Sequence, residues 1–360
     1  MPNSDATDSP YKNDSITPIT LEDSIRKRPA MYFGATGSKG IINLIDYLLK
    51  DFFKLCSAND FVFIISLHRD NSLSIEVSSE NNLVPFLQSL NPIINKIDYY
   101  STRFAIAASK TFKISNDKIE IIYINGQEQF SSYHNSSDCQ TNLIINLEPD
   151  ETVFGATNID YIALNQKLIL IPITNRQTEI ITKDERGKYL RQNYYHFPQG
   201  SFYIFDSVIN SLNGKPDFQL KFEGSLGEHQ YQIALADKYW GGSITSFANY
   251  IQTTCNGSLV DGVIEGIIIA SKKYIKANRL EHHKITKKKI MENFIIVCSV
   301  NGPDFDYEGS FRQKLSSNIV QSQSKELVRK WIYNYLASDE NVRCSFLLHF
   351  KEHFLFPSER

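Results

Sequence analysis

The sequence predicts an α+β protein of two domains, in which helices cover one face of a mostly antiparallel sheet. The chain has 360 residues, which suits two domains of roughly 150 to 200 residues better than one compact core. Helical stripes alternate with short β-rich runs, and this pattern restarts at the segment Pro198-Gln199-Gly200. We therefore expect an N-terminal arm at 1–17, domains at 18–198 and 199–350, and a tail at 351–360.

Two helices are expected at the start of the first domain. The segment 19–28 predicts a short helix with Thr20 as its N-cap and Asp23 three residues later, and Pro29 is expected to close it. The segment 40–56 predicts a longer helix, because apolar residues recur at steps of three and four: Ile41, Leu44, Ile45, Leu48, Leu49 and Phe52.

A basic stretch with spaced glycines, "SIRKRPAMYFGATGSKG", joins these two helices. Gly34, Gly37 and Gly40 lie three residues apart within it. Such a stretch is typical either of a phosphate-binding loop or of a plain connection between helices.

The remaining elements follow from alternation and turn chemistry. Residues 60–77 predict a hairpin that turns at 69–71. The rest of the first domain is expected to form a short helix at 98–113, strands at 117–126 and 141–149, a helix at 158–171 and a strand with a hairpin at 178–190. The second domain is expected to form a helix at 200–213, two strands within 218–240, a strand, glycine loop and long helix within 243–279, a buried strand at 293–300 and a helix at 324–339.

Composition narrows the function classes. With 38 Lys and Arg against 40 Asp and Glu the net charge is −2, so the whole surface is not that of a basic duplex-DNA binder. The five cysteines are odd in number and form no CxxC pair, which favours reduced thiols over a disulfide framework or metal site. No apolar run reaches about 18 residues and the N-terminus is polar, so we expect a cytoplasmic protein without a membrane segment.

Four segments, in order, resemble the N-terminal half of the DNA gyrase B subunit. They are "SPYKNDSITPITLEDSIRKRPAMYFG", "TNLIINLEPDETVF", "SFANYIQTTCNGSLVDGV" and "GPDFDYEGSFRQKLSS". The first matches the family signature R-K-R-P-G-M-Y-I-G except at Ala30 and Phe33. The resemblance implies an α/β sandwich of the gyrase, chaperone, histidine-kinase and mismatch-repair (GHKL) type, followed by a transducer domain with a ribosomal-protein-like fold. It also implies that the glycine stretch connects helices and does not itself hold phosphate.

The resemblance locates the ATP chemistry of the family on the helix 40–56. The family uses a Glu as general base and, four residues later on the same helix face, an Asn that binds Mg²⁺. Aligned from Gly40, these positions are Tyr47 and Asp51. A tyrosine with a pKa of ~10 is a poor base, whereas Asp51 could still bind Mg²⁺. Asp46 lies one residue away, about 100° round the helix, and is a poor substitute for the base.

The adenine side of the site is altered as well. In the family an Asp of a D-x-G-x-G motif binds the adenine amino group, and here Ser78 or Ser79 takes its place. No glycine occurs between Gly40 and Gly126. Thr141 survives from the family's G-T-x motif.

The phosphate side departs further from the family. The family's lid is rich in glycine, ends at a helix N-terminus and wraps the triphosphate with backbone N–H groups. Here bulkier residues replace small ones: Tyr99, Tyr100, Thr102 and Arg103. Arg312 replaces the transducer lysine that reaches the γ-phosphate, and Tyr11 matches the arm tyrosine that packs on the partner subunit.

Each surviving residue also has an ordinary explanation. Thr141 suits a strand, Asp51 a solvated helix surface, Arg312 a loop and Tyr11 a disordered tail. The lysine run, which is typical of a solvated turn, could alternatively contact DNA or an acidic partner; it comprises Lys284, Lys287, Lys288 and Lys289.

Three functions remain open at this level. The first is a non-catalytic gyrase B-like module without a cofactor, which acts as a homodimer or with a gyrase- or topoisomerase-type subunit and meets DNA only indirectly. The second is an ATP-binding subunit of a type II topoisomerase-like system with Mg²⁺ at Asp51, Thr141 near adenine, Arg312 at the γ-phosphate and Asp46 as base. The third is a small-molecule pocket in the former ATP site, lined by Tyr47, Tyr99, Tyr100 and Phe311. Because the sequence stops at Arg360, we expect no cleavage domain and no complete topoisomerase.

Overall fold

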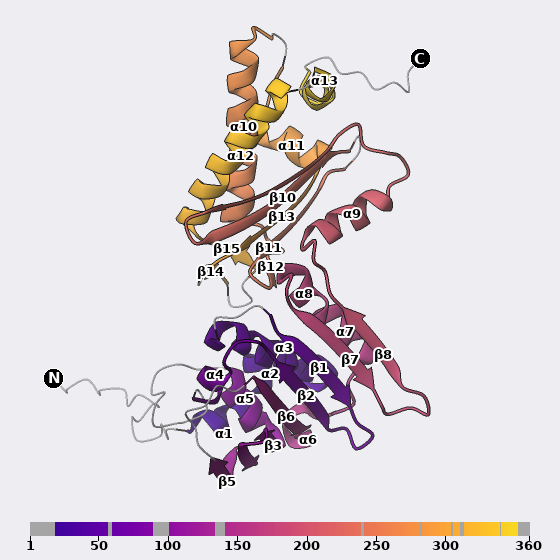
Figure 1. The fold of residues 1–360 in the computed structure, drawn as a ribbon, viewed down its shortest axis with the longest axis vertical. Coiled ribbons are helices and arrows are strands. Elements are labelled where there is room, and N and C mark those ends of the chain that lie inside the picture. Colours follow the sequence, from indigo (N-terminus) through magenta and orange to yellow (C-terminus); the bar gives the residue numbers. More distant parts are fainter. Residues whose placement is uncertain are drawn as a thin grey trace, which may run out of the picture. The chain divides into compact units, whose positions relative to one another are not determined.

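The computed structural model of the chain is drawn in Figure 1. It describes residues 19–56, 60–88, 101–133, 141–238, 241–280, 283–303, 305–309, 313–338 and 340–351. The chain divides into two compact units, one of residues 1–167 and 181–193 and the other of residues 168–180 and 194–360. The chain thus passes between the units after 167, 180 and 193. The expected arm at 1–17, and the expected tail except Lys351, lie outside the described residues.

The first unit is built on a large sheet. Its eight described strands follow the order β5-β4-β3-β6-β2-β1-β7-β8. The strands are β1 (Val62–Leu67), β2 (Leu73–Ser78), β3 (Ser109–Ser115), β4 (Ile119–Ile124), β5 (Gln127–Tyr133), β6 (Asn142–Pro149), β7 (Glu179–Asp184) and β8 (Arg191–Tyr195). In the part of the sheet from β5 to β1, which includes β6, each strand pairs antiparallel with its neighbour, as the sequence predicts. The helices are α1 (Leu21–Lys27), α2 (Pro29–Phe33), α3 (Gly37–Cys56), α4 (Val84–Gln88), α5 (Ser101–Ala108), α6 (Glu151–Phe154) and α7 (Tyr161–Leu168).

The start of the chain follows local capping rules. The Thr20 side chain accepts a hydrogen bond from the backbone N–H of Asp23 at 3.1 Å, which confirms the predicted N-cap of α1. Pro29 ends α1 and also begins α2 as its first residue, a position that needs no N–H. Gly34 then ends α2 with a φ of 70°, which glycine adopts without strain. Because α3 begins at Gly37, the glycine stretch is a connection between helices.

Several elements differ from those that the sequence predicts. The helix expected at 98–113 covers only Ser101–Ala108, and residues 109–115 form β3 instead. Here alternate burial of β-branched and aromatic side chains outweighs the helical pattern. The helix expected at 158–171 is two helices, α7 and α8 (Leu170–Thr174). Strand β5 was not predicted, because its polar sequence QEQFSSY carries no apolar alternation.

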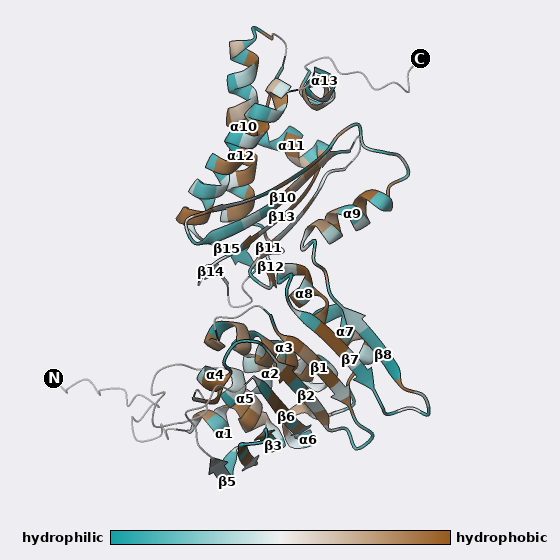
Figure 2. Ribbon diagram, viewed as in Figure 1, coloured by the Kyte–Doolittle hydropathy of each residue, from teal (hydrophilic) through white to brown (hydrophobic). Residues whose placement is uncertain are grey.

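One face of the large sheet packs against helices and the other is more polar. Inward residues of β2 and β6 are buried, namely Leu73, Ile75, Val77, Leu143, Ile145 and Leu147. The predicted stripe of α3 is buried as well, and hydrophobic residues gather along α3 and the strands next to it (Figure 2). Burial of these side chains on one face drives the sandwich, because each fully buried aliphatic side chain contributes about 1.5–3 kcal/mol.

The second unit contains a five-stranded sheet in the order β12-β11-β13-β10-β9. Its strands are β9 (Gln219–Leu226), β10 (His229–Asp237), β11 (Ser243–Ala248), β12 (Ile251–Gln252) and β13 (Phe294–Asn301), beside a small ribbon of β14 (Tyr307–Glu308) and β15 (Lys314–Leu315). Strands β11 and β13 run parallel, and the chain between them includes α10 (Ser258–Ala277) and α11 (Lys287–Asn293). The other helices are α8, α9 (Phe202–Asn210), α12 (Asn318–Ser338) and α13 (Glu340–Leu348).

Helices cover both faces of this second sheet. Ile233 of β10 and Ile296 of β13 belong to the core formed with α10, α12 and α13. Ala234 and Ile295, which alternate with them, pack against α9 around Phe205. Burial on both sides explains why β13 is apolar along almost its whole length. Within the described ranges, no helix combines the length and apolar character that crossing a membrane requires.

Glycines bring α10 and α12 into close contact. A Cβ at Gly262 would lie 2.4 Å from the backbone oxygen of Gln321 and 2.1 Å from Oγ of Ser324. A Cβ at Gly266 would lie 2.8 Å from the backbone oxygen of Lys325. Backbone on the partner helix cannot move aside as a side chain can, so this approach requires glycine.

We predict that Gly262→Ala destabilises the chain although alanine favours helices by about 1 kcal/mol over glycine. The added methyl group must push α12 away, at a cost of about 1–3 kcal/mol. Urea unfolding monitored by circular dichroism measures the effect. Gly214→Ala, where no atom lies within 4 Å of the new Cβ, is the control and should be close to neutral. Equal stability of the two variants would contradict the close packing.

Candidate functional site

Asp51 is the central residue of the candidate site. It lies on α3, and only 6 % of the residue is exposed. Its Oδ2 accepts hydrogen bonds from the backbone N–H of Thr102 at 2.8 Å and from the Thr102 hydroxyl at 3.0 Å. Thr102 is the second residue of α5, so the carboxylate of Asp51 caps the N-terminus of that helix. The alternative of a solvated helix surface is therefore wrong for Asp51.

The burial of Asp51 changes its acidity. Desolvation raises the pKa of Asp51 to about 6, against the lowering effect of the hydrogen bonds from Thr102 and Ser101 and the charge of Lys54. The carboxylate of Asp51, on α3, is thus bonded directly to Thr102 at the start of α5.

Asp46, the alternative base, lies in an ion-paired cluster. Its side chain is 2 % exposed. Oδ2 accepts a hydrogen bond from Nζ of Lys50 at 2.7 Å and lies 3.3 Å from Nζ of Lys167. Lys50 and Lys167 thus hold the Asp46 carboxylate by charge-assisted contacts. Tyr47, at the family's base position, is half-buried on α3.

The end of β2 presents its two serines to opposite faces. Ser78 is exposed on the outer face, together with Glu76. Ser79 is buried, and its hydroxyl donates to Oδ1 of Asp60 at 2.8 Å. Of the two serines aligned with the adenine-binding Asp, only Ser79 therefore points inward. Asp60 also accepts from the backbone N–H of Glu80 at 2.8 Å, so it holds the turn after β2.

The inward positions next to this turn are apolar. Val77 pairs with Leu143 across β2 and β6, and these residues are 2 % and 1 % exposed. Thr141 precedes β6, is exposed, and accepts the backbone N–H of Ser79 at 3.0 Å through its carbonyl. The inward-facing residues of β2 and β6 thus place no carboxylate here that could bind an adenine amino group.

Aromatic rings fill the interior beside Asp51. Phe52 of α3 stacks on Phe86 of α4 with 3.8 Å between ring centroids and 9° between planes. Phe61 and Phe63 lie edge-on to Phe52 at 5.9 and 5.8 Å. All four rings are fully buried. Close packing of rings at these distances leaves no room for another planar ligand between them.

Arg26, in the last turn of α1, holds the opposite end of α5. The Arg26 guanidinium donates to the carbonyl of Ala107 at 2.9 Å and pairs with Asp150, the N-cap of α6. Burial raises the pKa of Asp150, but hydrogen bonds from Thr152 and Arg26 outweigh this effect and leave the pKa below its usual value. Arg103 of α5 lies 3.4 Å from a carboxylate oxygen of Glu22 on α1. Helix α5 is therefore fastened at both ends.

Several predicted positions lie outside the described residues, namely Tyr11, Tyr99, Tyr100, Phe311 and Arg312. The lysine run begins α11, where Lys287 pairs with Asp261 at 2.7 Å and Lys288 lies 3.8 Å from Glu292. The sequence analysis missed the role of Thr102. Its signal is weak, a Thr at the start of a helical segment, and its partner Asp51 lies 51 residues away.

Comparison with known proteins agrees with this architecture. The family model described as DNA gyrase B matches residues 205–347. The gyrase B subunit of Archaeoglobus fulgidus is 24% identical over 391 residues, which cover 96% of this chain and 60% of that protein. The topoisomerase 4 B subunit of Staphylococcus aureus is 23% identical over 363 residues, which cover 91% of this chain and 54% of that protein.

Solved structures show the same fold. The gyrase B subunit of Myxococcus xanthus superposes with a TM-score of 0.73 at 17% identity, over 91% of this chain and 99% of that one. The ATP-binding domain of Francisella tularensis topoisomerase IV, solved with a small-molecule inhibitor, also superposes with a TM-score of 0.73. The identity is 19%, over 90% of this chain and 94% of that one. The chain is gyrase B-like. Its fold is the expected α/β sandwich followed by a transducer domain, and it spans somewhat more than half the length of the curated relatives.

The gyrase B-like site does not fit Mg²⁺ and ATP as the resemblance requires. Its metal position, Asp51, is bonded to Thr102, and its inner strands carry Val77 and Leu143. Among the residues that the structure describes, no three or more His, Cys, Asp or Glu side chains gather as a metal site.

We predict that Asp51→Asn changes the pH dependence of stability. The pKa of Asp51 is about 6 in the folded chain and about 3.9 in an unfolded one, so the folded chain binds this proton more tightly. The contribution of Asp51 is therefore fully present below about pH 4 and is lost as the pH rises through about 6. Relative to wild type, the variant should gain about 3 kcal/mol in unfolding free energy between these pH values.

Urea unfolding at several pH values tests this, with Asp60→Asn as the matched control. Burial raises the pKa of Asp60, but hydrogen bonds from Asn81, Ser79 and Glu80 outweigh this effect. The net result is a pKa below the usual value for Asp. The stability that Asp60 contributes is lost as the pH falls, so its difference curve should slope the other way. A flat curve for Asp51→Asn would show that its carboxylate is solvated.

Proposed function

We propose that this chain is a gyrase B-like ATPase and transducer module that does not hydrolyse ATP and acts through protein contacts. It dimerises or pairs with a topoisomerase-type subunit, and it meets DNA only through that partner. No cofactor is needed for this role.

The observation that carries the proposal is the bond between Asp51 and the N-terminus of α5. The resemblance implies that the N-terminus of this lid helix binds the triphosphate. In this chain an anionic group of the protein itself accepts the hydrogen bond of that helix N-terminus. A nucleotide would have to displace Asp51 and leave a buried carboxylate without its donors, which costs several kcal/mol.

The other positions support the same proposal. Tyr47 is a poor base at neutral pH, and Asp46 is held by Lys50 and Lys167. Loss of a general base alone lowers the rate by about 10²–10⁴-fold. Meanwhile α1 keeps its Thr20 cap and Arg26 pairs with Asp150, so these parts of the fold do not depend on nucleotide chemistry.

The relatives support a partner of the topoisomerase type. They carry the names of gyrase and topoisomerase subunits, and this chain matches only part of their length. A module with this fold and without turnover would influence a topoisomerase through the surfaces it shares with the true subunit.

We expect no binding of ATP to the purified chain at millimolar concentrations, with or without Mg²⁺. Isothermal calorimetry and thermal unfolding measure this together, because a ligand that binds the native state must raise its melting temperature. Tyr47→Glu should not restore hydrolysis, because Asp51 would still occupy the helix N-terminus. Mg²⁺-dependent binding that Asp51→Ala abolishes would favour the rearranged ATP site instead.

We also expect the chain to associate without nucleotide. Analytical ultracentrifugation of the chain alone, and mixed with a gyrase B subunit, should show a dimer mass in the absence of ATP. Tyr11→Ala should weaken this association about tenfold or more if the arm packs on the partner. Tyr189→Ala, at a tyrosine that is 75 % exposed, is the matched control. A monomer in both samples would contradict the proposal.

A further inference from the structure

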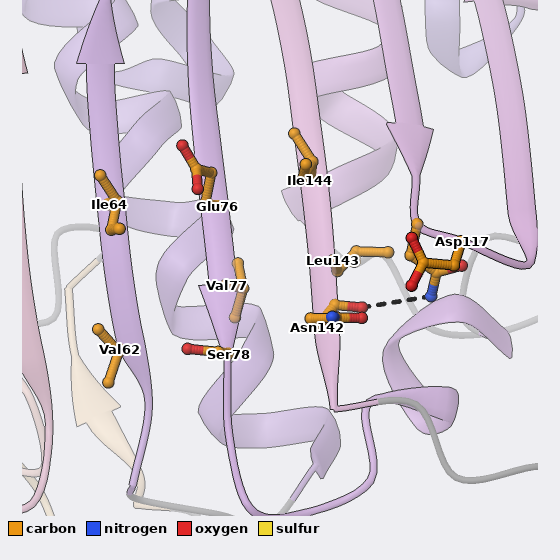
Figure 3. A pocket seen from close by; sticks show the side chains of 10 residues that line it. Val62, Ile64, Glu76, Val77, Ser78, Asp117, Asn142, Leu143 and Ile144 are labelled. Carbon is orange, nitrogen blue, oxygen red and sulfur yellow. Dashed lines mark hydrogen bonds between the residues drawn. The ribbon is translucent and has the colours of Figure 1, made fainter.

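A hollow on the outer face of the large sheet is unused by the site described above. It has a volume of about 210 Å³. Figure 3 shows it over β1, β2 and β6, with the helices behind the strands and the outward side chains toward the viewer. Val62, Ile64 and Ile144 give it an apolar floor, and Glu76 and Asp117 are its two carboxylates.

The strand register places Glu76 between two isoleucines. Glu76 of β2 lies opposite Ile64 of β1 on one side and opposite Ile144 of β6 on the other. Figure 3 shows the three side chains in one row. Ile144 is 39 % exposed, so part of the apolar floor is open to solvent. In the next row Ser78 lies between Val62 and Asn142.

Other carboxylates on the same face have cations beside them. Glu120 of β4 lies 2.5 Å from Nζ of Lys113, and Glu148 of β6 lies 2.8 Å from Nζ of Lys110. Cross-strand pairs of opposite charge are the usual arrangement on an exposed sheet face. Within the described part of the chain, no Lys, Arg or His forms an ion pair with Glu76. These two ion-paired carboxylates contrast with Glu76 at the hollow.

We infer that this hollow binds a lysine or arginine side chain from an extended segment of a partner protein. The aliphatic stem of such a side chain would lie on Ile64 and Ile144, while its cation would reach Glu76. Long basic side chains commonly bury their stems along apolar surface and keep the charge in contact with water and acidic groups. The negative charge of Glu76 matches the cation of such a side chain, and the apolar floor of Ile64 and Ile144 matches its aliphatic stem.

The size of the hollow agrees with a side chain better than with a metabolite. Pockets for drug-sized ligands usually enclose about 300–1,000 Å³, whereas this one holds about 210 Å³ and opens to solvent. The inference rests on the proposed function in one respect only, that a partner protein exists. It does not depend on whether the chain binds ATP.

Methyl NMR of isoleucine-labelled full-length chain tests the inference. The probe is the peptide acetyl-Val-Lys-Val-Lys-Val-amide, and the matched peptide carries Glu in place of Lys. The basic peptide should shift the methyl signals of Ile64 and Ile144, which Ile→Val variants assign, and the acidic peptide should not. The shifts should decrease with added salt, because the contact lies at the surface.

Charge variants make the test specific. Glu76→Gln should weaken binding of the basic peptide about threefold to fivefold, as expected for a surface ion pair. Glu120→Gln, which removes a carboxylate already paired with Lys113 on the same face, is the control and should leave binding unchanged. Glu76→Lys should abolish binding of the basic peptide and confer binding of the acidic one. Glu76 is exposed, so these variants should fold normally.

Three outcomes would overturn the inference. Equal shifts with both peptides would indicate a purely apolar surface. Equal binding by the Glu76→Gln and Glu120→Gln variants would show that Glu76 is not the recognised charge. Concentration-dependent shifts of Ile64 and Ile144 without peptide would identify a second copy of this chain as the occupant. None of these results bears on ATP binding, so failure here and failure of the proposed function can be told apart.

Discussion

The hydrogen bonds from Thr102 to Asp51 determine what the first unit can do. They join the C-terminal part of α3 to the first turn of α5, across 51 residues of sequence. A helix N-terminus attracts one anion strongly, because its free N–H groups and its dipole point the same way. Once a buried carboxylate takes that place, the helix is fixed against α3. An external phosphate then competes with a group that is tethered to the chain and always present.

The rest of the interior is consistent with this fixed arrangement. Val77 and Leu143 face each other on the inner side of β2 and β6, and Phe52 stacks on Phe86 beside Asp51. Such packing stabilises the fold by burial, whereas a nucleotide site must keep polar groups and space available. The interior beside Asp51 is therefore part of the core of the first unit.

The sequence predicts this fold far better than it predicts the site. The stripe of α3, the cap at Thr20 and the hairpin of β1 and β2 depend on local spacing, and all three are confirmed. The orientation of Ser78 depends on which residues of β2 face the helices, and the bond from Thr102 to Asp51 joins segments distant in sequence. Spacing alone cannot reveal either one, because tertiary packing selects the face and the partner.

The two faces of the large sheet follow from the same alternation but have opposite consequences. On the inner face, Val77 is 2 % exposed and contributes to core packing. On the outer face, Glu76 keeps a charge between Ile64 and Ile144 although a neutral or paired residue would be more stable there. A residue that lowers stability without an internal partner is best explained by an external one. The outer face of the large sheet is thus where we propose that the first unit recognises another protein.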